Sequence, residues 1–227
     1  MGLSQSAVKH VGTSKVRLLH NVAGAPQVDV YVDGHKKVKD VAYKDSTDFL
    51  VIGAGRHRLV VKAAGAKRSD KCLVAATVCV KRNMMYTLIV VGDLECGLAV
   101  VPVVDELEGT DQCPKPKFSD DKSYVRFIHA AKDVPAVDVW SKGGVEGDTK
   151  VFPNFDYKDA SQYKAVDAGT IRLVVAPTDS LNPVLGPIDL SLEAGQLYTV
   201  VATGKLENEA TPLDAVLLKD RDLAIVL

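Results

Sequence analysis

This chain contains an internal repeat. The run Val16-Arg17-Leu18-Leu19-His20 returns as Val125-Arg126-Phe127-Ile128-His129, so that positions 16 and 125 correspond with a shift of 109. Val28 to Tyr31 returns as Val137 to Trp140 with the same shift, and Tyr86-Thr87 returns as Tyr198-Thr199. Two similar halves in a chain of 227 residues predict two copies of one domain, because each half is long enough to bury its own core.

The repeat defines a domain plan. We assign an N-terminal tail to 1–13, a first repeat to 14–107, a linker to 108–122 and a second repeat to 123–227. The linker contains Gly109, Pro114 and Pro116 among many charged residues, which is typical of an exposed, semi-rigid connection.

Each copy is built of short segments rich in Val, Ile, Leu, Tyr and Thr, separated by Gly, Pro and Asp. Val28, Val30 and Val32 alternate with Asp29 and Tyr31, and no segment keeps a helical period. The pattern therefore predicts an all-β chain of two tandem seven-stranded, immunoglobulin-like antiparallel β-sandwiches. In the first copy the expected strands are roughly 15–20, 27–33, 47–52, 57–63, 72–81, 85–92 and 98–104.

Charge and hydropathy exclude several classes of protein. The chain has 28 Lys and Arg against 29 Asp and Glu, so it lacks the basic excess of a nucleic-acid-binding protein. No stretch reaches the roughly 18 apolar residues of a membrane-spanning helix. Residues 1–10 lack the apolar core of a secretory signal, although Gly2 and Ser6 fit the pattern for N-myristoylation at Gly2.

Two pairs of residues are candidates for ligand binding. Arg17 with Tyr31, and Arg126 with Trp140, are expected on outward faces of adjacent strands, where each guanidinium can lie over the ring. Such pairs can stabilise the surface by holding adjacent strands together, or they can form a shallow binding platform for a sugar.

His20 with Asp29, and His129 with Asp138, are the most site-like combinations. A histidine and a carboxylate are two parts of a metal site or of a general-base pair. Strand parity, with strands one and two as a hairpin around Pro26, places each His and Asp on opposite faces, which favours a structural role. In that role His20 holds the following loop through backbone hydrogen bonds.

Tyr86 and Tyr198 each open the sixth strand of their copy, where β-sandwiches often place a tyrosine that bonds to the backbone. This role is also structural.

The four cysteines show no zinc-binding spacing. Cys72 and Cys96 are expected at neighbouring ends of strands five and six, which makes them the candidate disulfide. Cys79 is expected to be a small buried residue, and Cys113 in the linker is either free or paired between chains.

The chain ends on five apolar residues, Leu223 to Leu227. They can extend the last strand, pack on the sandwich, or add to the sheet edge of a partner and so create a homo-oligomer.

The repeated runs VRLLHNVAGAPQVDVYVDG and VRFIHAAKDVPAVDVW resemble the opening of the domain of unknown function 4397. An Ala-Gly before the fourth strand and a Tyr-Thr at the sixth strengthen the resemblance, which covers about residues 14–105 and 123–221. It implies a β-sandwich and an extracellular, cell-surface or virion location, and it brings no established activity.

The sequence contains no phosphate loop and no Gly-x-Ser-x-Gly elbow, so we predict no catalytic residue, no metal and no cofactor. The leading hypothesis is a non-enzymatic structural or adhesive module with a protein or glycan partner. A carbohydrate-binding module using Tyr31 and Trp140 is the first alternative, and a metal-dependent enzyme using His20 or His129 is the second.

Overall fold

A computed structural model describes residues 12–106, 118–144, 147–180, 182–206 and 208–222. Gly2, Cys113 and Leu223 to Leu227 lie outside these ranges. The described residues form strands, turns and loops, and among them no helix is long and apolar enough to cross a membrane.

Each repeat contributes eight strands. In the first repeat they are β1 (Thr13–His20), β2 (Val28–Val32), β3 (His35–Val41), β4 (Leu50–Gly53), β5 (Gly55–Ala63), β6 (Val74–Val80), β7 (Met84–Asp93) and β8 (Gly97–Glu106). In the second they are β9 (Lys122–His129), β10 (Val137–Gly144), β11 (Gly147–Phe155), β12 (Lys164–Asp167), β13 (Gly169–Pro177), β14 (Leu185–Leu192), β15 (Gln196–Thr203) and β16 (Asp214–Asp222).

The strands form four sheets of four, two in each repeat. The first repeat has the orders β4-β1-β7-β8 and β3-β2-β5-β6, and the second repeats them as β12-β9-β15-β16 and β11-β10-β13-β14. Most neighbours are antiparallel, but β1 pairs with β7, and β9 with β15, in parallel. The prediction of an all-β chain with two tandem sandwiches is confirmed, with one strand more in each copy and one parallel pair.

The additional strand, β3, was missed because it is an edge strand with a polar sequence. Five of its seven residues are exposed, and only Val38 and Val41 reach the core. Its counterpart β11 has a similarly polar start. An edge strand has one neighbour and buries little, so hydrophobic alternation is weak there.

The hairpin predicted around Pro26 is wrong. β1 and β2 belong to different sheets, so the chain crosses from one layer of the sandwich to the other at this point. Parity along a hairpin therefore does not relate His20 to Asp29.

Each sandwich has its own core, built from the alternating inward residues of its two sheets. Val16, Leu18, Val28 and Val30 belong to the first core, and their counterparts Val125, Phe127, Val137 and Val139 to the second.

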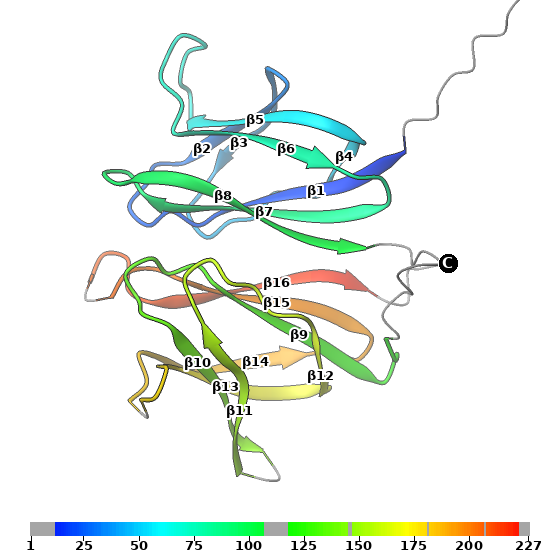
Figure 1. Cartoon of the computed structure of the whole chain (residues 1–227), viewed down its shortest axis with the longest axis vertical. Coiled ribbons are helices and arrows are strands. Elements are labelled where there is room, and N and C mark those ends of the chain that lie inside the picture. Colours follow the sequence, from blue (N-terminus) through cyan, green and yellow to red (C-terminus); the bar gives the residue numbers. More distant parts are fainter. Residues whose placement is uncertain (1–11, 107–117, 145–146, 181, 207, 223–227) are drawn as a thin grey trace, which may run out of the picture.

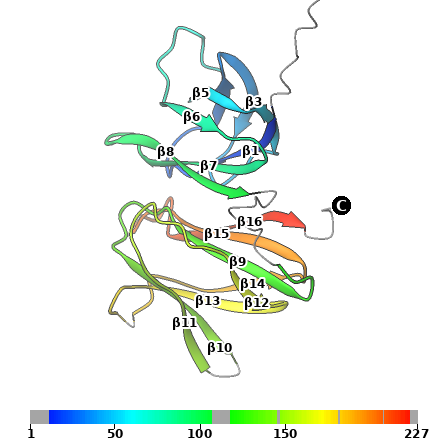
Figure 2. The same cartoon turned by 45° about the vertical axis from the view of Figure 1, so that its right-hand side comes forward.

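A third buried cluster lies between the repeats and joins Leu19, Ile89, Val91 and Val103 to Ile128, Ala130, Val201 and Leu218. The sheet containing β1, β7 and β8 thus packs its outer face on the outer face of the sheet containing β9, β15 and β16 (Figures 1 and 2). The two domains are not connected by the linker alone. They form a stack of four layers, in which β3-β2-β5-β6 and β11-β10-β13-β14 are the outermost sheets.

Candidate functional site

Arg17 and Arg126 do not lie on a free surface. Both are buried between the two domains, with 4% and 3% of their surface exposed. The rings beneath their guanidinium groups are those of Phe49, at 4.8 Å, and Tyr163, at 4.6 Å, rather than Tyr31 and Trp140. The predicted Arg–aromatic platforms are therefore wrong, because the outer face of β1 and β9 is covered by the other repeat.

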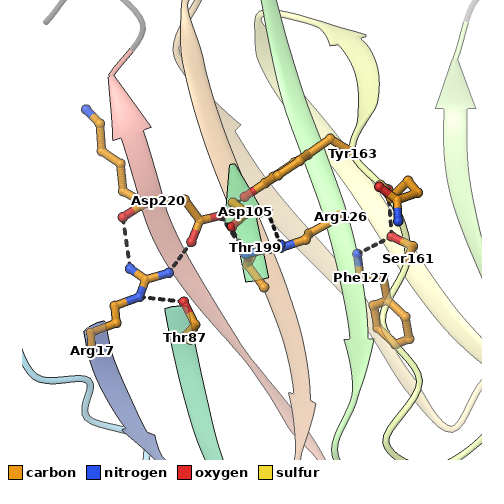
Figure 3. Close-up of polar contacts among 11 residues, drawn as sticks. Arg17, Thr87, Asp105, Arg126, Phe127, Ser161, Tyr163, Thr199 and Asp220 are labelled. Atoms are coloured by element: carbon orange, nitrogen blue, oxygen red, sulfur yellow. Dashed lines mark hydrogen bonds and ion pairs between the residues drawn. The ribbon is translucent and has the colours of Figure 1, made fainter. Parts of the chain in front are cut away.

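Each arginine bonds to a threonine of its own domain through Nε and to the other domain through its terminal nitrogens. Arg17 Nε donates to Thr87 Oγ1 at 3.0 Å, and its terminal nitrogens bind the carbonyl of Lys219 and the carboxylate of Asp220 (Figure 3). Arg126 repeats the arrangement in the second domain, with Nε 2.6 Å from Thr199 Oγ1 and Nη1 2.8 Å from Asp105 Oδ1.

Asp220 is the most heavily bonded carboxylate of this interface. Besides Arg17, it accepts hydrogen bonds from Thr199 Oγ1 at 2.5 Å and from the Tyr163 hydroxyl at 2.9 Å. Burial raises the pKa of Tyr163, so its hydroxyl stays a donor.

Asp105 has fewer partners. Burial raises its pKa, and the nearby Arg126 guanidinium opposes that rise. Two arginines and two aspartates balance in charge within the interface. Such a network holds one domain against the other. Arg126 Nη2, which makes no hydrogen bond to the described residues, is itself buried.

Each of the two outermost sheets holds a cluster of a different kind, formed by an aspartate, a lysine and an aromatic residue. Asp29 is buried, and its carboxylate accepts hydrogen bonds from Lys36 Nζ at 2.6 Å, from the N–H of Asp40 at 3.1 Å and from the N–H of Gly65 at 3.2 Å. Lys36 Nζ also lies 5.5 Å from the centre of the Tyr31 ring. One lysine thus joins the buried carboxylate to the half-buried aromatic ring.

In the second repeat Lys150 takes the place of Lys36. Its Nζ lies 2.6 Å from Asp138 Oδ2 and 5.0 Å from the centre of the Trp140 ring, while the N–H of Asn154 donates to Asp138 at 2.8 Å. We call these two groups, Asp29–Lys36–Tyr31 and Asp138–Lys150–Trp140, the outer-face clusters.

A β-bulge explains the buried carboxylates. The pairing of β2 with β3 shifts register between Val28 and Val30, and Asp40 in the bulging strand has a φ of 55°. Asp29 fills the bulge and binds the N–H that it frees. The equivalent Asn154 has a φ of 51°, beside Asp138.

The charge state of both carboxylates follows from these bonds. Burial alone would raise the pKa of Asp29, but the bonds from Lys36 and from the two N–H groups outweigh it and lower the pKa. The pKa of Asp138 is lowered in the same way by Lys150 and Asn154. Both aspartates are therefore anions that keep their lysines in place under the rings.

The lysines are the residues that sequence reasoning missed. Lys36 follows the Asp33-Gly34 turn and pairs directly with Tyr31 across the β2–β3 hairpin. The Asp33-Gly34 turn after Val32 was the available signal in the sequence. The pairing of Lys36 with Tyr31 follows from it only if the residues after the turn are recognised as a strand.

His20 and His129 are buried and hold the loops that follow β1 and β9. His20 Nε2 donates to the carbonyl of Pro26 at 3.0 Å, and His129 Nε2 lies within 3.2 Å of the carbonyls of Val134 and Pro135. The loop contact expected from the sequence is present in both copies. Asp29 and Asp138 lie in the other sheet of each sandwich, so the structure does not bring either His–Asp pair together.

Tyr86 and Tyr198 each bond to the backbone just before their own strand. The hydroxyl of Tyr86 accepts from the N–H of Lys81 at 2.9 Å, and that of Tyr198 accepts from the N–H of Glu193 at 3.1 Å. Both therefore tie an adjoining turn to the sandwich.

The predicted Cys72–Cys96 disulfide is not formed. Cys72, Cys79 and Cys96 are all free, because Cys72 precedes β6 in one sheet while Cys96 lies in the β7–β8 turn of the other. Cys79 is exposed rather than buried, since it points away from the core between Val78 and Val80. Within the described ranges, no group of three or more His, Cys, Asp and Glu side chains could hold a metal ion.

Two tandem sandwiches of this topology, docked face to face, define a class of small two-domain β-proteins. The chain belongs to the family of the domain of unknown function DUF4397, whose model matches it twice, over residues 14–114 and 120–226.

No curated protein matches the sequence. Among solved structures, a family 26 carbohydrate-binding module from Eubacterium rectale, in complex with maltoheptaose, is 12% identical, with a TM-score of 0.29, over 92% of this chain and 97% of that one. The TIE protein of Bacillus anthracis is 10% identical, with a TM-score of 0.28, over 93% of this chain and 42% of that one. A candidate cell adhesion protein from Parabacteroides distasonis is 10% identical, with a TM-score of 0.25, over 92% of this chain and 97% of that one.

Proposed function

We propose that the protein is a non-enzymatic module that acts at a surface, such as a cell surface, an envelope, a wall or a virus particle. It binds a partner through the outermost sheets, β3-β2-β5-β6 and β11-β10-β13-β14. The observation that carries this proposal is the outer-face cluster, which occurs at equivalent positions on both of these sheets.

The position of the clusters supports binding at both ends of the stack. Val30 and Val139 point into their cores, so Tyr31 and Trp140, on adjacent positions, point to the opposite face. That face lies away from the domain interface. A partner can therefore approach each ring without disturbing the packing of one repeat on the other.

The domain interface supports a display role. Eight apolar residues are buried in it, and its arginines are paired across the repeats. A buried face of this kind holds two domains in one orientation, as a module that presents two binding faces requires.

Carbohydrate is the partner class we favour for these faces. A half-buried aromatic ring with a lysine amine beside it offers a stacking surface and a hydrogen-bond donor, the two elements of a shallow sugar site. The lysines keep 42% and 36% of their side chains exposed, so their amines remain within reach of a ligand.

The alternative of a metal-dependent enzyme gains no support from the geometry. His20 and His129 are buried and bonded to backbone carbonyls, and Asp29 and Asp138 are held by lysines.

The test is a comparison of binding by the native chain and by three variants, Tyr31→Ala, Trp140→Ala and the double change, on a glycan array and on immobilised cell-wall material. Each single change should weaken binding about fivefold or more, since stacking on a ring contributes about 1–3 kcal/mol. Lys122→Ala is the control, because Lys122 lies on an inner sheet, away from the proposed binding faces, and pairs with Asp167 in a surface salt bridge.

Unchanged binding in the double variant would refute the role of the rings, whereas specific turnover of any substrate by the pure protein would refute the non-enzymatic proposal. Unfolding curves for each variant separate lost binding from lost structure.

A further inference from the structure

Among the ion pairs between the repeats, the two that involve arginine are equivalent contacts. Arg17 and Arg126 are equivalent by the repeat shift of 109. Tyr86 of β7 pairs with Val104, and its counterpart Tyr198 of β15 pairs with Lys219. Asp105 and Asp220 directly follow these two partners and are therefore equivalent. Arg17 of the first copy binds Asp220 of the second, and Arg126 of the second binds Asp105 of the first.

The surroundings of the ion pairs repeat in the same way. Thr87 and Thr199, which accept from the two Nε atoms, correspond to each other, and so do the rings of Phe49 and Tyr163 beneath the guanidinium groups. The apolar cluster between the domains contains the equivalent pairs Leu19 with Ile128, Ile89 with Val201, and Val103 with Leu218.

Two further contacts join equivalent positions directly. Lys205 Nζ lies 2.5 Å from Asp93 Oδ2, and these two residues correspond by the shift that relates Tyr86 to Tyr198. Asn21 Nδ2 donates to the carbonyl of Ala130 at 3.1 Å, and these correspond by the shift of 109. A position that touches its own equivalent lies on a two-fold axis, while exchanged contacts such as Arg17–Asp220 and Arg126–Asp105 lie on either side of it.

We infer that the outer face of the β4-β1-β7-β8 sheet and its copy are one homotypic docking surface, so that either repeat can dock on the same face of a second copy of this domain carried by another chain. Within one chain, the covalent connection supplies the partner at an effective concentration in about the millimolar range, which favours the closed form. The Asp93–Lys205 pair adds a preference for unlike repeats, since two first repeats would bring Asp93 against Asp93.

The test reverses the charges of one repeat in the full chain. All variants carry Asp93→Asn and Lys205→Gln, which remove like charges from the axis. In the variant Arg17→Asp with Asp105→Arg, position 17 meets Asp220 and position 105 meets Arg126, so both arginine ion pairs between the repeats become repulsive. Between two first repeats, however, positions 17 and 105 attract each other, and between two second repeats Arg126 and Asp220 do.

The expected result is that this variant associates through like repeats. Sedimentation velocity at micromolar concentration should show dimers and larger species that dissociate on dilution, while the Asp93→Asn, Lys205→Gln background stays monomeric. Reversing all four positions, by adding Arg126→Asp and Asp220→Arg, restores attraction within the chain and should return the protein to a monomer.

The mirror variant, Arg126→Asp with Asp220→Arg alone, provides an independent second trial, because by symmetry it should associate in the same way. A folded monomer in either trial would overturn the inference. Loss of folding in both would also count against it, since docking of like repeats should restore the interface. Specific association that persists after the four-position reversal would assign it to another surface and overturn the inference as well.

Discussion

Lys36 Nζ lies 2.6 Å from Asp29 Oδ2 across the β2–β3 hairpin, and Lys150 stands at the same distance from Asp138 in the second repeat. Both lysines lie in polar edge strands, β3 and β11, whose sequences show little hydrophobic alternation. Because the same lysine–carboxylate pair occurs in both domains, we infer that both domains require the bulge.

The first prediction concerns this carboxylate. Asp29→Ala should lower the free energy of unfolding by about 1–3 kcal/mol, because it leaves the N–H groups of Asp40 and Gly65 without their acceptor. Urea unfolding, followed by far-UV circular dichroism, measures this change in the free energy of unfolding. Asp167→Ala is the control: Asp167 pairs with Lys122 at the surface, and its loss should cost less than about 1 kcal/mol. Equal effects of the two substitutions would contradict the role of Asp29 in the bulge.

The second prediction concerns pH. Burial lowers the pKa of both His20 and His129 below the ordinary 6.5, and the Nδ1 atoms of both rings find no hydrogen-bond partner among the described residues. Protonation would place an N–H there with no acceptor. The stabilisation from the neutral rings is therefore complete above pH 6.5 and is lost as the pH falls through the lowered folded-state pKa values.

Stability should accordingly decline between pH 7 and pH 5, and the decline should be shallower in His20→Gln and in His129→Gln. Unfolding midpoints measured across this range provide the check. An equally steep pH dependence in the native protein and in both variants would exclude this account of the histidines, and the comparison removes the opposite contribution of His57, whose pKa is raised by Asp33.

The third prediction concerns the domain interface. Asp220→Ala should destabilise the protein by about 3–5 kcal/mol, because it leaves the buried guanidinium of Arg17 without its carboxylate. The matched control is Glu193→Ala, which removes an exposed carboxylate bonded to Lys219. Thermal unfolding should show a large loss for the first variant and almost none for the second. A small effect of Asp220→Ala would mean that water reaches this interface.

The fourth prediction compares two glycines. Gly92 has a φ of 120°, and a Cβ there would lie 2.4 Å from the carbonyl oxygen of Gly97, whereas Gly34 has a φ of 80° and open space around it. Gly34→Ala should cost only the backbone strain, about 1–2 kcal/mol. Gly92→Ala should cost clearly more, because backbone atoms of the β7–β8 hairpin must also move. Denaturant unfolding of the two variants tests the difference, and a reversed order would contradict the hairpin geometry.

The fifth prediction concerns the thiols. In a Cys113→Ser background, Cys79 and Cys96 should react rapidly with a maleimide in the folded protein, and Cys72, which is half-buried, more slowly. Mass spectrometry of the labelled chain counts the modified sites. Protection of Cys72 and Cys96 that disappears on adding a reductant would show that the pair does form a disulfide.

The sequence was sufficient to predict the two β-domains because the repeat and the alternation of Val28, Val30 and Val32 are local signals. The tyrosines near the start of β7 and β15, and the histidines that end β1 and β9, could be assigned structural contacts for the same reason.

The location of Arg17 and Arg126 could not be predicted, because it depends on which face of one sandwich meets the other. An arginine on the outer face of a strand has the same pattern whether that face meets water or a second domain. The predictions of a β1–β2 hairpin and of a Cys72–Cys96 disulfide were wrong for a related reason, because sequence order does not show which sheet a strand joins.

The reciprocal ion pairs have a consequence for how the two halves can change over time. A charge altered at position 17 loses its bonded partner Asp220, which lies 203 residues further along the chain, in the other half. Each half therefore limits the substitutions that the other half tolerates at the interface. A chimera that combines the first half of one family member with the second half of another should fold well only where these partners match.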